Sequence, residues 1–496
     1  MVKPNDKNFR KYTLWVITAA AIFRFFVLLR FDLTPQESYY WNFARHPALG
    51  YFDHPSVMPW TIWLTTKIFG TNIVGIRLGA WLYGIGALIF LWLIAKKIWD
   101  EKIAFWAVLS AICVPLFNVA GMFFTPDPPL VFFWLGSTFL LIEAIETDSW
   151  IYWILTGLSA GLSMLSKYTA VFWFFGAFLF LLLNQKYRKH LASPKLYVAL
   201  FISLVAFSPE IIWNAQHKWA SFLYQSARRA NEIRHIRIGY FFGYIGAQLF
   251  AVSPILYVGA VVKSLKSPFA YIKAIRGKTE SSKKILADSI ILSFSLPLLL
   301  FFSAVAILYW VKLNWLIPIY FIPIAGYVEW SIELNKKWHT LGAILAALTT
   351  LILIIVMIFP LVPITGEMVS TYGWDKLASR MESELMHVPD ITFIFGAEYK
   401  VPAELSYHLP NRPQVCGPNV IGLRGMEFTY WVNLDTLAGR DAIFALDPRW
   451  GFSLERARKL LPKYFEKVEE TEPLPVYRGG AKVTTYYIFR CYNYEP

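Results

Sequence analysis

The feature that most constrains this chain is a series of apolar runs, each about twenty residues long, with short polar loops between them. A run of this length is what an α-helix needs to cross the hydrocarbon core of a bilayer, because the helix advances by about 1.5 Å per residue. Of the 496 residues, 56% are hydrophobic and only 16% are charged. We therefore predict an α-helical, polytopic membrane protein.

The apolar runs predict about eleven membrane-spanning helices before residue 361. The first run is too long for the core of a signal peptide, and no cleavage-site pattern follows it, so we interpret it as a span. The predicted spans are 12–30, 73–95, 103–118, 128–143, 150–166, 169–184, 196–213, 239–262, 287–308, 316–334 and 338–360.

The formal charge of +14 raises the question of a nucleic-acid partner, but the Lys and Arg residues lie in short loops between apolar runs. We therefore expect no nucleic-acid partner and use the charges to predict topology. With the N-terminal tail in the cytoplasm, the inner loops carry about 20 Lys and Arg and the outer loops about 10, as the positive-inside rule requires. An odd number of spans then places residues 361–496 outside the cytoplasm.

The chain changes character at 360–363, which predicts a membrane domain over residues 1–360 and a small α/β domain over 361–496. In the second domain, residues 391–395, 442–446 and 484–489 have the pattern of strands, and 401–408 and 454–461 that of helices. In an oxidising compartment Cys416 and Cys491 could form a disulfide, and two free thiols are the open alternative.

Segment 33–57 is rich in ionisable and aromatic residues although it lies between two apolar runs. The following residues, 58–69, are too few to span a bilayer and predict a helix in the membrane interface, as do the residues around 39–43. Segment 33–57 is therefore either an anchor at the level of the lipid headgroups or part of a site, and we favour the site.

Most of the unusual polar residues fall in the predicted outer loops. Ionisable groups at membrane depth are costly unless they face one another or a water-filled cavity, so we expect these loops to converge on one polar cavity. Carboxylates there could take a proton from a hydroxyl, and cations could hold a departing phosphate. The residues are Glu37, Asp53 and His54 in the first loop, Asp127 in the second, Lys167 and Tyr168 in the third, Arg228 and Arg229 in the fourth, and Lys312 and Asn314 in the fifth.

Six ordered motifs over roughly residues 10–360 resemble the bacterial branch of the protein mannosyltransferase superfamily. These are membrane glycosyltransferases of the GT-C class, related to the aminoarabinose transferase of lipid A modification. The motifs are PQESYYW, GYFDHPSV, TPDPPL, SKYTA, SPEIIWNAQHKWASF and VKLNW. The resemblance implies an enzyme of the bacterial inner membrane that moves a sugar, with inversion, from a polyprenyl phosphate to an acceptor on the periplasmic side. Lipid A, another glycolipid and a protein hydroxyl are all open as acceptors, and the sugar is open too.

The resemblance also implies catalytic residues. Family members carry an acidic general base in the first outer loop, often as an Asp-Glu pair, and here Gln36 stands at the first position and Glu37 at the second. Asp127 matches the acidic residue of the second outer loop, so Glu37, Asp127 and Asp53 are the catalytic candidates.

The remaining candidates would bind the donor or line the site. The aminoarabinose branch has Arg where Tyr39 stands, and Glu-Lys in place of Asp53 and His54, so the phosphate would depend more on other cations. The candidates for phosphate binding are Lys167, Arg228, Arg229, His54 and Lys312, and those for lining the substrate site are Gln36, Tyr39, Tyr40, Tyr168 and Asn314.

Several features have a simpler interpretation. Residues 34–37 also have the pattern of a helix start capped by Glu37, and Lys167 could extend from a span end to the membrane surface. A lipid flippase and a membrane-anchored binding protein are the rival functions. No His or Cys spacing predicts a metal site, so we expect no required cofactor, although a divalent ion stays an open alternative.

Overall fold

The computed structural model describes residues 6–226, 235–277, 282–359, 369–389 and 392–496. The chain divides into two compact units. The first, here called the helical unit, comprises Met1–Leu28, His54–Thr61 and Arg77–Leu353. The second, here called the sheet unit, comprises Leu29–Asp53, Ile62–Ile76 and Ile354–Pro496.

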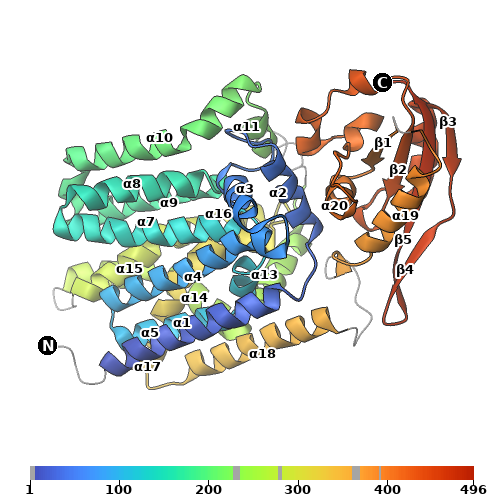
Figure 1. The fold of residues 1–496 in the computed structure, drawn as a ribbon. Helices are drawn as coiled ribbons and strands as arrows, with labels where there is room; N and C mark the ends of the chain where they lie inside the picture. The colour runs from blue at the N-terminus through green and yellow to red at the C-terminus, as the bar shows by residue number, and fades with distance from the viewer. Residues whose placement is uncertain (1–5, 227–234, 278–281, 360–368, 390–391) are drawn as a thin grey trace. The chain divides into compact units, whose positions relative to one another are not determined.

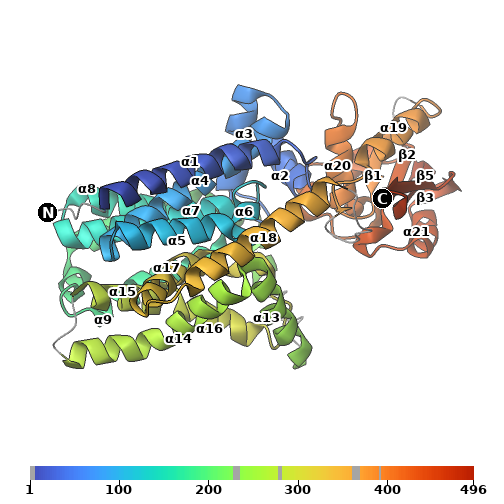
Figure 2. The same cartoon turned by 90° about the horizontal axis from the view of Figure 1, so that it is seen from below.

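Many of the helices in the helical unit run side by side (Figures 1 and 2). Its helices are α1 (Asp6–Leu28), α4 (Ile73–Ile98), α5 (Glu101–Cys113), α6 (Pro115–Ala120), α7 (Asp127–Thr147), α8 (Trp150–Met164), α9 (Val171–Leu183), α10 (Pro194–Gln216), α11 (Ala220–Gln225), α13 (Ile238–Val252), α14 (Pro254–Gly277), α15 (Ser282–Phe294), α16 (Leu296–Val305), α17 (Ile317–Glu333) and α18 (Trp338–Ile358). Short 3-10 helices lie between some of them: η1 (Tyr168–Ala170), η2 (Arg188–Ala192) and η3 (Leu313–Leu316).

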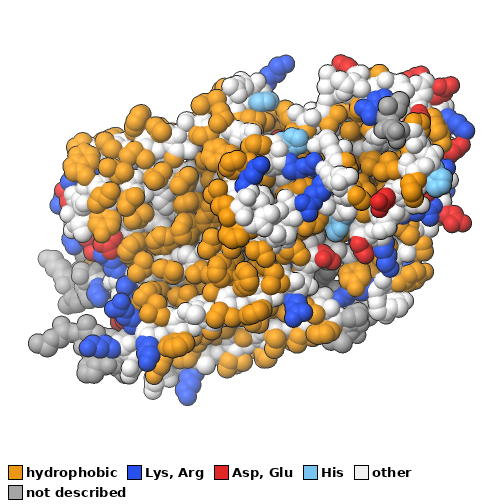
Figure 3. Space-filling model, in the orientation of Figure 1, with side chains coloured by type: hydrophobic (Ala, Val, Ile, Leu, Met, Phe, Trp, Pro, Cys, Tyr) orange, Lys and Arg blue, Asp and Glu red, His pale blue; other side chains and the backbone are white. Residues whose placement is uncertain are grey.

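Eight helical stretches within the described ranges are long and apolar enough to cross a membrane. They are α1, α4, α7, α10, α14, α15 with α16, η3 with α17, and α18. The predicted span 103–118 corresponds to α5 with α6, and the predicted span 150–166 corresponds to α8. The predicted span 169–184 corresponds to the short apolar helix at Tyr168–Leu183. The polytopic helical fold is confirmed. Figure 3 shows hydrophobic side chains over these helices and Lys and Arg side chains at the left edge, where helices end.

The single span predicted at 239–262 is wrong. The structure has two helices there, α13 and α14, because the backbone at Ser253 turns to a φ of 88° and Pro254 begins the second helix. Proline has no N–H to donate and fits the first turn of a helix, so the Ser-Pro step ends one helix and starts another. Helix α14 continues to Gly277, beyond residue 262 at which the predicted span ends.

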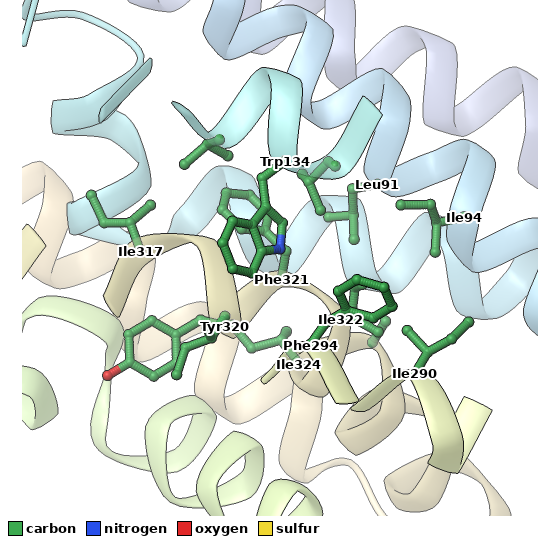
Figure 4. Close-up of a cluster of buried hydrophobic side chains, with 14 of the residues drawn as sticks. Leu91, Ile94, Trp134, Ile290, Phe294, Ile317, Tyr320, Phe321, Ile322 and Ile324 are labelled. Carbon is green, nitrogen blue, oxygen red and sulfur yellow. The ribbon is translucent and has the colours of Figure 1, made fainter. Parts of the chain in front are cut away.

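The centre of the helical unit is an apolar cluster in which α4, α7, α15 and α17 meet (Figure 4). Trp134 of α7 lies beside Phe321 of α17 in this view, and Leu91 of α4 and Phe294 of α15 belong to the same cluster. Elsewhere the helices approach through small residues. A Cβ added to Gly157 of α8 would lie 2.2 Å from a backbone oxygen of α10, so only glycine allows this approach.

The sheet unit contains one mixed sheet with the strand order β1-β2-β5-β3, and β4 pairs with another part of β5. Strands β1 and β2 are parallel, and the other pairs are antiparallel. The elements are α2 (Pro35–Arg45), α3 (Val57–Phe69, shared with the helical unit), α19 (Trp374–Leu385), β1 (Phe393–Gly396), α20 (Lys400–His408), β2 (Ala442–Leu446), α21 (Leu454–Leu460), β3 (Phe465–Glu470), β4 (Leu474–Arg478) and β5 (Ala481–Tyr494).

Side chains alternate across the central strands, so the sheet has a core on each face. Phe395 and Phe444 point to one core, whereas Ile394 and Ile443 point to the other, which α19 and α20 cover. The predicted small α/β fold is confirmed, although α19, β3 and β4 were missed. Cys416 and Cys491 are free and buried on the first face, and burial raises the pKa of Cys416 to about 12.

Candidate active site

Asp127 is the residue at which three of the predicted outer loops meet in the helical unit. Its Oδ1 accepts a hydrogen bond from Lys167 Nζ at 2.6 Å, and its Oδ2 accepts one from Asn314 Nδ2 at 2.6 Å. Thr125 Oγ1 also donates to Oδ2, at 3.3 Å. Asp127 is 2% exposed and Lys167 is 8% exposed, so this ion pair is buried. The structure thus brings the second, third and fifth outer loops together.

The local sequence explains why the Asp127 side chain is held at this place. Asp127 is the first residue of α7, and Pro128 and Pro129 follow it in the first turn, where a missing N–H costs no helical hydrogen bond. A carboxylate at this end of a helix interacts favourably with the unpaired N–H groups. Lys167 lies between α8 and η1 in an extended conformation.

Tyr168, the residue after Lys167, contacts a second buried carboxylate. Tyr168 Oη donates to Glu210 Oε1 at 2.6 Å and lies 2.7 Å from Ser221 Oγ. Asn214 Nδ2 donates to the same oxygen of Glu210 at 2.9 Å, and Glu210 is fully buried in α10. The sequence analysis missed Glu210, although a Glu within a long apolar segment is itself a signal of function.

Glu37 belongs to the sheet unit and caps the start of α2. Thr34 Oγ1 accepts from the Glu37 backbone N–H at 3.2 Å, while Glu37 Oε2 accepts from the Thr34 backbone N–H at 3.0 Å. This reciprocal pair is a capping box, so the simpler interpretation of residues 34–37 is confirmed. The side chain is fully buried, and its role as the general base stays a prediction.

Helix α2 packs on segments of the sheet unit that are more than 350 positions away in the sequence. Tyr399 Oη donates to Gln36 Oε1 at 2.9 Å. The ring of Tyr39 lies 4.6 Å from that of Tyr399 and stacks on Phe428, and Tyr40 is buried beside it. Tyr39 and Tyr40 are therefore closely packed within this unit.

Acidic groups surround the Tyr39 hydroxyl. Its oxygen accepts from the Glu427 backbone N–H at 3.2 Å, and the Glu427 carboxylate accepts from the Phe52 backbone N–H at 2.7 Å. Burial raises the pKa of Tyr39 well above its ordinary value, and the charges of Asp53 and Glu427 raise it further. Asp53 is partly buried, and its charge acts on the Tyr39 hydroxyl. The sequence gives no local signal for Glu427.

A further buried carboxyl group, Glu404 of α20, faces α2. It is fully buried and lies 3.1 Å from His408 Nε2. Burial raises the pKa of Glu404, and the nearby Glu37 raises it as well, against the opposing effects of His408 and Ser38. The net effect is a pKa of Glu404 above its ordinary value. The sequence analysis missed this residue too.

Four predicted phosphate-binding residues remain: Lys312, His54, Arg228 and Arg229. Lys312 is exposed and immediately precedes η3, two residues before Asn314. His54 is partly buried at the start of a segment of the helical unit. Arg228 and Arg229 lie outside the described residues. Within the described ranges, no three His, Cys, Asp or Glu side chains are grouped so that they could hold a metal ion.

Two comparisons of sequence identify similar proteins. Residues 53–213, which include both Asp127 and Lys167, match the family model described as Dolichyl-phosphate-mannose-protein mannosyltransferase. The chain is also 25% identical over 413 residues to the Lipid A galacturonosyltransferase RgtD of Rhizobium johnstonii, which covers 80% of this chain and 81% of the relative.

Solved structures show the fold. ArnT from Cupriavidus metallidurans bound to undecaprenyl phosphate matches with a TM-score of 0.61 at 14% identity, over 96% of this chain and 97% of that one. The archaeal oligosaccharyltransferase AglB from Archaeoglobus fulgidus, in complex with an inhibitory peptide and a dolichol-phosphate, matches with a TM-score of 0.52 at 12% identity, over 96% and 74%. The resemblance found in the motifs is confirmed, and this multi-pass membrane protein has the fold of the GT-C glycosyltransferases.

Proposed function

We propose that this chain is an inverting glycosyltransferase that moves a sugar from a polyprenyl-phosphate donor to lipid A or a similar lipopolysaccharide acceptor. The observation that carries the proposal is the buried Asp127–Lys167 pair with Asn314, in a chain with the GT-C fold. Similarity to a lipid A galacturonosyltransferase favours a lipid A acceptor and makes a hexuronic acid the first sugar to test. We place the reaction at the periplasmic face of a bacterial inner membrane.

In the proposed reaction an acceptor hydroxyl attacks the anomeric carbon of the donor sugar. The bond from that carbon to the phosphate oxygen breaks, the phosphate leaves with the electron pair, and a carboxylate takes the hydroxyl proton. Lys167 supplies positive charge for the departing phosphate. No divalent ion is needed in this scheme, because fixed cations can stabilise the phosphate.

We infer different roles for the carboxylates. Both oxygens of Asp127 already accept hydrogen bonds, so it would lose one of these contacts on taking a proton. Asp127 therefore positions Lys167 and Asn314, and the proton goes to Glu37 or Asp53 of the first loop. Tyr168 is fixed by Glu210, which orients the segment that carries Lys167.

The test is transfer by the full-length purified chain in lipid nanodiscs, with undecaprenyl-phosphate-linked sugars as donors and lipid A as acceptor. Mass spectrometry should detect lipid A heavier by one sugar with the wild type, and at least about 100-fold less product with Asp127→Asn, the loss typical of one electrostatic group. Asp148→Asn, an exposed acid at the other end of α7, is the matched control and should keep activity. Movement of a labelled polyprenyl lipid across the membrane without any sugar transfer would instead support a flippase.

A further inference from the structure

A cavity lies between α7, α8, α9 and α10, far along the helices from Asp127. Its volume is about 90 Å³, and its lining is almost wholly apolar. Because one water molecule needs about 10–15 Å³ of such volume, the cavity has room for several methylene groups of an aliphatic chain. Leu141 lines it and lies fourteen residues after Asp127, which is about 21 Å along α7. The cavity is therefore separate from the candidate active site.

Close backbone contacts keep the cavity from collapsing. Gly157 and Gly161 of α8 lie so near α10 that an added Cβ would come within 2.2 and 2.5 Å of backbone oxygens. Gly176 of α9 makes a similar contact with α15. The helices are thus held in place beside the cavity, while the residues that face it from α8, α9 and α10 include Ala160, Ala177 and Ala199. Small side chains between fixed helices leave space for an apolar chain.

Cations lie at one end of the cavity. Leu191 and Leu196 line it, and each follows basic residues in the connection between α9 and α10. Lys189 is exposed in η2. Lys195 Nζ lies 2.8 Å from Asp148 and 5.6 Å from the ring of Trp150. Lysine ammonium groups next to an apolar lining suit a ligand that has an aliphatic chain and a negative headgroup.

A buried polar atom also belongs to the lining. Trp153 is fully buried and contributes to the cavity wall, and its indole Nε1–H has no acceptor among the residues that the structure describes. The indole of Trp173, which also lines the cavity, donates to Thr138 at 3.0 Å. A buried donor without an acceptor is costly, so an occupant that brings an oxygen acceptor would relieve this cost.

We propose that this cavity binds an acyl chain of an acidic glycerophospholipid. The aliphatic chain occupies the space between α8, α9 and α10, and the phosphate headgroup lies near Lys189 and Lys195. An oxygen of the lipid accepts the hydrogen bond of the Trp153 indole. This lipid is a structural ligand and is distinct from the donor, which binds at the Asp127 end of the helices.

The test uses the full-length chain, delipidated in detergent, with phosphatidylglycerol, phosphatidylcholine and undecaprenyl phosphate as separate probes. Native mass spectrometry measures the lipid retained, and thermal denaturation measures the shift in Tm. The wild type should bind phosphatidylglycerol at least several-fold more tightly than phosphatidylcholine. Ala177→Leu, which fills the cavity, should weaken phosphatidylglycerol binding about tenfold or more and keep or raise Tm without lipid. Leu158→Phe, on an exposed part of α8, is the matched control.

The charge requirement has its own variants. Lys189→Gln with Lys195→Gln should remove the preference for phosphatidylglycerol over phosphatidylcholine, while Lys→Arg at both positions should keep it. Lys336→Gln with Lys337→Gln, a basic pair elsewhere, should have no effect. Equal phosphatidylglycerol binding by the wild type and Ala177→Leu would overturn the proposal. Stronger binding of undecaprenyl phosphate than of phosphatidylglycerol, lost in Ala177→Leu, would assign the cavity to the donor chain and overturn it as well.

Discussion

Replacing Asp127 by Asn changes the charge of the candidate site with little change of shape. In the wild type Lys167 donates to one oxygen, and Asn314 and Thr125 donate to the other. An Asn side chain offers one acceptor oxygen and one NH₂ group that only donates. Either Lys167 or Asn314 then faces another donor, and the Lys167 ammonium loses its buried counter-charge.

The expected loss of stability follows from the burial of Asp127 and Lys167, which are 2% and 8% exposed. Removing one partner of a buried ion pair costs about 3–5 kcal/mol of stability, mostly because the other charge is left uncompensated. Sugar transfer should fall by about 100- to 1,000-fold, the loss typical of one group that stabilises developing charge. The two effects are measured separately, by thermal denaturation in detergent and by mass spectrometry of the lipid A product.

A double substitution separates the two roles of Asp127. Asp127→Asn with Lys167→Gln removes both charges, so it should be more stable than Asp127→Asn alone while it stays inactive. Asp148→Asn should match the wild type in activity. The reasoning would be refuted if Asp127→Asn behaved like Asp148→Asn in both assays, or if the double substitution were no more stable than the single one.

Three further outcomes are expected. Glu37→Gln should keep the fold, because Gln also completes a capping box. If Glu37 takes the proton from the acceptor hydroxyl, this variant should transfer sugar about 100-fold or more slowly than the wild type. Transfer at the wild-type rate would assign the proton to Asp53. Burial disfavours the charged form of Glu384, but hydrogen bonds from Arg490 and Arg380 outweigh it and hold its pKa below the usual range. Its contribution to stability is thus present above the unfolded pKa of about 4.3 and is lost as pH falls through the lower folded value. Glu384→Gln should therefore lower Tm at pH 7 and flatten the acid dependence of Tm, whereas Glu382→Gln, exposed on the same helix, should do neither. Sugar transfer should survive treatment with EDTA, and a loss that Mg²⁺ or Mn²⁺ restores would show that a divalent ion is required.

Local sequence patterns determined much of the secondary structure and of the polar site. The strand predicted at 442–446 is observed as Ala442–Leu446, and a helix is observed over Val57–Phe69, where one was predicted at 58–69. Asp127, Lys167 and Asn314 were predicted to meet, because charges at membrane depth must face one another. These predictions succeed because hydrophobic periodicity, proline and burial cost depend on residues close together in the chain.

Only the tertiary structure decided which distant side chains are partners. The contacts of α2 with Tyr399 and Glu427, and the Tyr168–Glu210 hydrogen bond, join residues that lie between 42 and 388 positions apart in the chain. The burial of Glu404 likewise depends on the packing of distant segments. The break at Ser253 was also missed, because apolar residues on both sides of it continue the pattern of a single span. Apolar composition predicts that a segment is removed from water, but the packing of whole helices and strands decides which neighbour the segment contacts.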